Sequence, residues 1–308
     1  MGAEAGYYRK SHIRNLHMLN KRIIARLDIK GPNLVKGIHL EGLRVLGKPE
    51  QFARHYYEAG ADEMMYVDVV ASLYDRNSLH DIVTRTAKEI FIPLTVAGGI
   101  RTLDDIRDIL RAGADKVSLN TAAVKRPEII KEASRKFGSS TIVITIEAIK
   151  QPDGRYLAYT DNGREFTGIE VLRWAAMVEA LGAGEIVITS VDREGTGLGF
   201  DLELTKMVAE AVSIPVIAHG GAGSLEDIKS VIKTGKADAV AVASMLHYDF
   251  ISKNGIRGDY KNEGNIEFLK SGRGFPKINM ATLPEIKKYL CNQNVSCRYN
   301  LKNVQSNA

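Results

Sequence analysis

Two short apolar runs contain a carboxylate near their end that could take part in acid–base chemistry. "IIARLDIK" (23–30) carries Asp28, and "IVITIEAIK" (142–150) carries Glu147. Two carboxylates that flank an elongated substrate can divide the general acid and general base roles if their surroundings separate their pKa values. Asp28 and Glu147 are therefore our candidate catalytic residues.

Both carboxylates also have a possible structural role. Asp28 could pair with Lys30 or Lys36, and Glu147 could pair with Lys150. The sequence leaves the catalytic and the ion-pairing interpretation open for each residue.

Two glycine pairs, Gly98-Gly99 and Gly220-Gly221, stand between an apolar run and a segment with helical spacing. Glycine lets backbone N–H groups approach an anion closely, and the following helix presents its positive end to it. Two further short segments could complete these cradles: Asn120-Thr121 and Ala243-Ser244. Two matched cradles predict a substrate with a phosphate at each end, whereas glycines that only form tight turns are the alternative.

The elements that carry these residues occur twice in the chain. Residues 92–117 resemble residues 214–240, and residues 59–72 match residues 181–194 at the same offset. Asp28 and Glu147 are related by nearly the same offset. Self-similarity of this kind indicates that the second half repeats the first.

Each half contains four units of a strand followed by a helix. Short β-branched runs fall at 22–28, 63–70, 93–97, 115–120, 141–147, 185–191, 215–219 and 237–243. Several helical segments between them begin after Ser or Thr and end at Gly, as helices prefer. Strict alternation implies a parallel sheet covered by helices. Eight units in matching halves predict a (β/α)8 TIM barrel with a two-fold internal half-barrel repeat.

The predicted barrel places the candidate residues together. Active sites of this fold lie at the carboxyl ends of the strands. Strands one and five lie opposite each other, so Asp28 and Glu147 should face one another across the mouth, between the two cradles. Asp192 also stands at a strand end.

A second set of charged residues stands at the starts of strands one, two, four and six, with alternating sign: Arg22, Glu63, Lys116 and Glu185. These residues could close a ring around the barrel axis. The alternative is ordinary salt bridges at the barrel bottom, which contribute little to stability when exposed.

The rest of the chain flanks this barrel. We expect an N-terminal extension over 1–20, the barrel over 21–292 and a C-terminal tail over 293–308. Residues 249–282 are rich in Gly, Asn and Lys and predict an inserted loop before the last helix.

Composition excludes several classes of protein. The 308 residues are 44% hydrophobic and 26% charged, which is typical of a globular protein, and no apolar run approaches the roughly 20 residues of a membrane span. The net charge of +5 is spread without a basic block, so we expect no nucleic acid partner. The N-terminus lacks a secretory signal, which favours the cytoplasm. The two cysteines lack metal-ligand spacing, and we expect reduced thiols, no metal and no cofactor.

These residues resemble those of a known family, the cyclase subunit of imidazole glycerol phosphate synthase. The resemblance covers about 18–250 and rests on motifs such as "KRIIARLDIK", "IPLTVAGGIR", "GADKVSLNTAAV", "GAGEIVITSVDREGT" and "IPVIAHGGAGSLED". It implies a synthase that adds ammonia to a bis-phosphorylated formimino-aminoimidazole carboxamide ribotide. The products would be imidazole glycerol phosphate, for histidine biosynthesis, and aminoimidazole carboxamide ribotide.

The resemblance also implies roles for particular residues. Ammonia would come from a glutaminase partner docked at the barrel bottom, through a gate formed by the four-residue ring. Asp28 and Glu147 would hold the catalytic positions. Phosphate or substrate would contact Lys36, Gly98, Gly99, Asn120, Thr121, Asp192, Gly195, Thr196, Gly220, Gly221, Ala243 and Ser244.

The catalytic end departs from the family pattern. Glu147 stands where the family has aspartate, and His219 and Arg26 replace small residues. If Arg26 points inward, it adds bulk and a cation close to Asp28. Three interpretations follow. The chain is a working cyclase, a cyclase-like paralogue that supplies ammonia for amidation of a surface-polysaccharide sugar, or a non-catalytic activator of a glutaminase.

Overall fold

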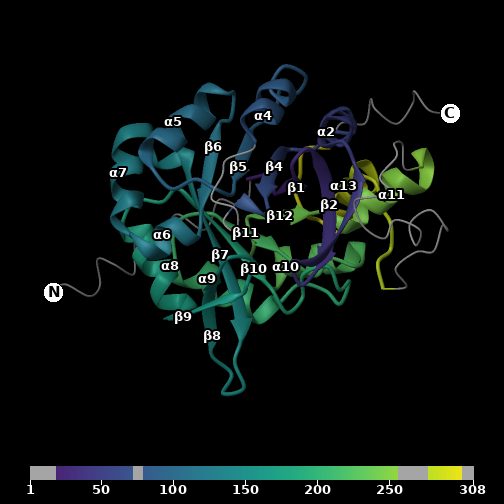
Figure 1. Ribbon diagram of the computed structural model, residues 1–308. Helices are drawn as coiled ribbons and strands as arrows, with labels where there is room; N and C mark the ends of the chain where they lie inside the picture. Colours follow the sequence, from purple (N-terminus) through teal and green to yellow (C-terminus); the bar gives the residue numbers. More distant parts are fainter. Residues whose placement is uncertain (1–18, 72–78, 256–276, 300–308) are drawn as a thin grey trace.

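The computed structural model describes residues 19–71, 79–255 and 277–299 of the chain. Eight parallel strands follow one another around a closed barrel, in which the last strand pairs with the first (Figure 1). In order they are β1 (Arg22–Lys30), β4 (Glu63–Asp68), β5 (Leu94–Ala97), β6 (Lys116–Leu119), β7 (Ile142–Lys150), β10 (Glu185–Ser190), β11 (Val216–His219) and β12 (Ala239–Val242). The predicted (β/α)8 TIM barrel is confirmed, and each predicted strand overlaps an observed one.

Helices cover the outside of the barrel (Figure 1). They are α2 (Pro49–Glu58), α4 (His80–Thr86), α5 (Leu103–Arg111), α6 (Thr121–Lys125), α7 (Glu128–Phe137), α8 (Val171–Ala180), α9 (Leu202–Ala211), α10 (Leu225–Lys233), α11 (Ser244–Asn254) and α13 (Leu283–Asn292), with a short 3-10 turn at Ser139–Thr141. Because both faces of the strands are covered, most strand residues are buried apolar side chains.

Two hairpins were not predicted. After β1 the chain forms β2 (Asn33–Ile38) and β3 (Glu41–Gly47), and after β7 it forms β8 (Tyr156–Thr160) and β9 (Glu165–Glu170). Each hairpin pairs antiparallel with the end of the strand before it, and β8 projects from the barrel (Figure 1). The hairpins extend β1 and β7 at the mouth, where Asp28 and Glu147 stand.

The predicted segment boundaries are partly corrected. The loop predicted over 249–282 is wrong at its start, because α11 continues to Asn254. Residues 256–276 of that loop and residues 1–18 of the N-terminal extension lie outside the described residues. The start of the predicted tail packs on the barrel: Val295 is buried, and the Lys21 N–H donates to the Ser296 carbonyl at 2.7 Å.

No helix in the described part of the chain is long and apolar enough to cross a membrane.

Candidate active site

Side-chain alternation along the strands builds the barrel interior in layers. Residues two apart on a strand point to the same face, so Arg22, Ile24, Arg26 and Asp28 of β1 all point inward. Ile24 belongs to an apolar layer inside the barrel that is separate from the main core: Ile24, Met65, Val143, Val187, Ile217, Ala239 and Ala241. The four-residue ring lies on one side of this layer and the carboxylates lie on the other.

The ring is closed at the amino-terminal end of the strands. The Arg22 guanidinium contacts Glu63 at 2.5 Å and Glu185 at 2.8 Å. Lys116 contacts the same two carboxylates, Glu63 at 3.3 Å and Glu185 at 2.9 Å. Each cation therefore bridges both anions around the axis. Both carboxylate side chains are at most 10% exposed, so these are not ordinary surface pairs.

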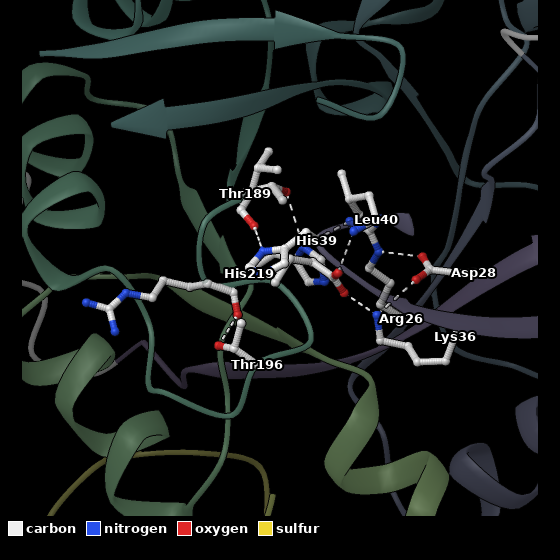
Figure 2. A network of polar contacts seen from close by, with 11 residues as sticks. Arg26, Asp28, Lys36, His39, Leu40, Thr189, Thr196 and His219 are labelled. Carbon is white, nitrogen blue, oxygen red and sulfur yellow. Dashed lines mark hydrogen bonds and ion pairs between the residues drawn. The ribbon is translucent and has the colours of Figure 1, made fainter. Parts of the chain in front are cut away.

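Asp28 lies in a buried ionic network at the other end (Figure 2). The Nε atom of Arg26 donates to Asp28 at 2.8 Å, and Lys36 lies 3.6 Å from the other carboxylate oxygen. Lys36 also pairs with Glu194, whose carboxylate accepts from the Leu40 N–H at 2.8 Å. Arg26 thus points inward, and of the two lysines considered for Asp28, Lys36 forms the ion pair.

His219 extends this network from β11, which is separated from β1 by β12 alone. Its Nδ1 atom lies 3.1 Å from a guanidinium nitrogen of Arg26 and 3.2 Å from the hydroxyl of Thr189. Burial, together with the nearby Arg26, holds the pKa of His219 well below its usual value, so the imidazole is neutral. Side chains from β1, β10 and β11 therefore meet in this network (Figure 2).

The pKa values of the two candidate catalytic carboxylates are shifted in opposite directions. Burial disfavours the ionised form of Asp28, but Arg26 and Lys36 outweigh it and hold its pKa well below the usual range. Burial raises the pKa of Glu147 to about 7, and the opposing Gly163 N–H and Arg26 offset it only in part. Asp28 is therefore ionised at neutral pH, while Glu147 can carry a proton.

Glu147 does not pair with Lys150. One Glu147 oxygen accepts from the Gly163 N–H at 2.8 Å, while the Lys150 ammonium contacts Glu203 at 2.6 Å. The ion pair considered for Glu147 from the sequence is therefore wrong, because the β7–β8 extension carries Lys150 away from the mouth.

Glu147 lines a cavity of about 360 Å³ in the first half of the mouth. The predicted residues of the first cradle all line it: Gly98, Gly99, Asn120 and Thr121. Further residues that line this cavity were not predicted from the sequence: Arg101, Lys125, Arg126, Asp161 and Asn162. Position after a strand end could have indicated Arg101, but Asp161 and Asn162 arrive through the unpredicted β8–β9 hairpin.

The second cradle has almost no free space. Gly195, Gly220, Gly221, Ala243 and Ser244 line a cavity of about 20 Å³, together with Lys36, Glu194 and His219. Asp192 and Thr196 line neither cavity. Asp192 accepts from the Lys150 N–H at 2.9 Å, and the Thr196 hydroxyl donates to the Arg193 carbonyl at 2.7 Å.

The glycines have a packing reason of their own. Gly98 and Gly220 have positive φ angles of 94° and 96°. A Cβ on Gly98 would lie 2.3 Å from the Asp68 carbonyl, and one on Gly220 would lie 2.7 Å from the Ser190 carbonyl. The close approach of neighbouring backbone requires glycine here whatever binds, so phosphate binding stays a prediction.

Known proteins show which family this barrel comes from. Residues 22–252 match the family described as "Histidine biosynthesis protein". A relative in Legionella pneumophila, named imidazole glycerol phosphate synthase subunit HisF, is 59% identical over 210 residues, which cover 68% of this chain and 99% of the relative. The chain belongs to this HisF family.

Two further HisF relatives cover more of this chain. One from Alkaliphilus metalliredigens (strain QYMF) is 49% identical over 235 residues, 76% of this chain and 93% of the relative. One from Thermosynechococcus vestitus is 48% identical over 246 residues, 78% of this chain and 88% of the relative. All of the candidate site residues lie within the segment matched by the family.

In this HisF-family barrel, two of the departures noted in the sequence lie together. Arg26 and His219 are both members of the buried network around Asp28. No group of three or more His, Cys, Asp or Glu side chains that could hold a metal ion occurs in the described ranges.

Proposed function

We propose that this chain is the synthase subunit of a glutamine amidotransferase complex, which takes up ammonia at the bottom of the barrel and delivers it to the mouth. The closed ring of Arg22, Glu63, Lys116 and Glu185 carries the proposal. Above this ring lies the apolar layer that contains Ile24. Apolar walls disfavour a charged ammonium ion and are compatible with neutral ammonia. The expected partner is a glutaminase docked at this end, in a cytoplasmic heterodimer.

Removing one cation of the ring tests ammonia transfer. Lys116→Met keeps the length of the side chain but leaves Glu63 and Glu185 with Arg22 as their only cation of the ring. We expect more glutamine to be hydrolysed for each ammonia incorporated by the complex with its glutaminase. Lys21→Met is the matched control, because Lys21 pairs with Asp238 at the same end of the barrel. An unchanged ratio in Lys116→Met would reject the gate.

Cyclisation is the first candidate use of the ammonia. The HisF relatives and the opposite pKa shifts of Asp28 and Glu147 support it. In this reaction the ionised Asp28 would act as the general base and Glu147 as the general acid while the imidazole ring closes. Purified protein given the bis-phosphorylated formimino substrate and ammonium salts should form imidazole glycerol phosphate without a partner. Turnover no faster than in a blank would reject cyclisation.

The second candidate use is transfer of ammonia to another enzyme, which amidates a surface-polysaccharide sugar. The ion pairs that hold Asp28 and the small second cradle favour it, because both restrict the room for a bis-phosphorylated substrate. Ammonia incorporation should then require the acceptor enzyme, with the ring still needed. Incorporation by the complex without an acceptor enzyme would reject this candidate.

A further inference from the structure

The two cradles at the mouth differ far more in the structure than in the sequence. Both have paired glycines followed by a helix, but the first opens into about 360 Å³ and the second into about 20 Å³. A cavity of about 20 Å³ holds roughly one water molecule. The enclosed space of the second cradle is therefore smaller than a phosphate group.

Side chains fill the second half of the mouth. The imidazole of His219 lines the 20 Å³ cavity and is fixed by Arg26 and Thr189. Arg26 is fixed in turn by its hydrogen bond to Asp28. All these side chains are buried, so rotating one of them away breaks a hydrogen bond or an ion pair inside the barrel.

The charges of this half are already balanced. The two cations, Arg26 and Lys36, are matched by two carboxylates, Asp28 and Glu194. A second anion here would have to compete with Glu194 for Lys36, and a buried ion pair is costly to break. The second half thus lacks both room and surplus positive charge.

The first half has more room and further cations. Its cavity is lined by Gly99 and Asn120 and by three cations that lie outside the Asp28 network: Arg101, Lys125 and Arg126. Arg126 also pairs with Glu132, and the carboxylates of Asp68, Glu147 and Asp161 line the same cavity. Arg26 reaches the wall of this cavity as well. Backbone N–H groups near glycine combined with several cations are the usual features of an anion site.

We propose that the mouth binds a ligand with a single phosphate group, held in the first cavity, and that His219 and Arg26 exclude a second phosphate from the other half. This inference goes beyond the proposed function and concerns only what binds at the mouth: a monophosphate ester or a ligand with one comparable anionic group. A mouth with one phosphate site leaves no second site for the bis-phosphorylated substrate of cyclisation.

Counting inorganic phosphate tests the proposal. Crystals of the full chain soaked in phosphate should show one anion, at Gly99 and Asn120. Equilibrium dialysis should saturate at one phosphate per chain. Two anions in the unmodified protein, or none at Gly99, would overturn the proposal.

Variants of His219 and Arg26 test whether these side chains exclude a second phosphate. His219→Ser replaces the imidazole with a small hydroxyl side chain, and the double variant Arg26→Ser/His219→Ser removes the guanidinium from this half as well. Saturation should rise from one phosphate to two, with the new anion at Gly221 and Ser244. Lys30→Ser, at the exposed end of the same strand as Arg26, is the control and should still bind one phosphate per chain. Folded variants that stay at one phosphate would show that these residues exclude nothing.

These outcomes are separate from those of the ammonia experiment. Lys116→Met should leave the phosphate count at one, because the ring lies on the far side of the apolar layer. An unchanged ratio of glutamine hydrolysed to ammonia incorporated in Lys116→Met would therefore reject the gate but not the single phosphate site. Two phosphates bound to the unmodified protein would reject the single phosphate site but not the gate.

Discussion

The ionisation of Glu147 depends on what surrounds one side chain. It is buried, and its partners are a backbone N–H from Gly163, the Asn120 side chain and the guanidinium of Arg26. Asp28 is also buried but has both Arg26 and Lys36 against it. The pKa values of these two carboxylates, which occupy matching places in the two halves, thus differ because the network places more positive charge beside Asp28 than beside Glu147.

We expect Glu147 to make stability depend on pH. Its pKa is raised from 4.5 to about 7, so the stability present below the usual glutamate pKa is lost as pH rises through about 7. Glu147→Gln removes this dependence. The stability of the variant relative to the unmodified protein should rise by up to about 3 kcal/mol between pH 4.5 and 7.5.

Denaturant unfolding across this pH range measures the difference. Glu165→Gln, at an exposed position of β9, is the control and should show no such trend. A Glu147→Gln difference that does not change with pH would mean that Glu147 is already ionised below pH 5.

At the scale of elements, the two helices that follow the glycine pairs begin in the same way. Before α5, the Thr102 hydroxyl accepts from the Asp105 N–H at 3.1 Å, and the Asp105 carboxylate accepts from the Thr102 N–H at 2.8 Å. Ser224 and Asp227 form the same capping box before α10. These caps fix where each helix starts and so hold the preceding glycines at the mouth.

Removing either cap should cost similar stability. Thr102→Ala and Ser224→Ala each leave helix N–H groups unsatisfied, and we expect each to lower the free energy of unfolding by about 1 kcal/mol. Ser230→Ala, at a half-buried position near the end of α10, should change it by less than about 0.5 kcal/mol. Chemical denaturation gives all three values. A cap variant as stable as the Ser230 control would contradict the capping role.

At the scale of the whole molecule, Asp62 joins the first strand to α13 and the residues that follow it. Its carboxylate accepts from the Ile23 N–H at 2.7 Å, contacts the buried Lys287 of α13 at 2.6 Å, and contacts Arg298 at 3.0 Å. The first strand, the last helix and the following segment therefore meet at one carboxylate, beside the end of the barrel where Arg22 lies.

Loss of this carboxylate should destabilise the whole barrel. Asp62→Ala leaves the Lys287 ammonium buried without its anion, which should cost about 3–5 kcal/mol. Arg298→Ala removes the exposed partner from the same carboxylate and should cost less than about 1 kcal/mol. Thermal and denaturant unfolding compare the two variants. If the two variants lose the same free energy of unfolding, the burial of Lys287 is not the reason for the loss in Asp62→Ala.

Much of this architecture could be read from residue patterns. Short-range spacing of apolar residues predicted the strand positions. The strand positions in turn placed the four-residue ring at one end of the barrel and Asp28 and Glu147 at the other. The hairpins escaped prediction because "NLVKGI" and "EGLRVLG" mix apolar residues with Gly, Lys and Arg, and their pairing has shifts in register. Asp161 and Asn162 of the first cavity were missed with them.

The sequence by itself determined the layers of this barrel, because alternation along each strand fixes which side chains point inward and at which end they lie. Only the tertiary structure decided what those side chains meet. Arg26 and His219 are 193 residues apart in the chain but 3.1 Å apart at the barrel axis. Their contact leaves one cradle open and the other filled. Ion pairing and burial depend on distances across the closed barrel, and no local pattern encodes such distances.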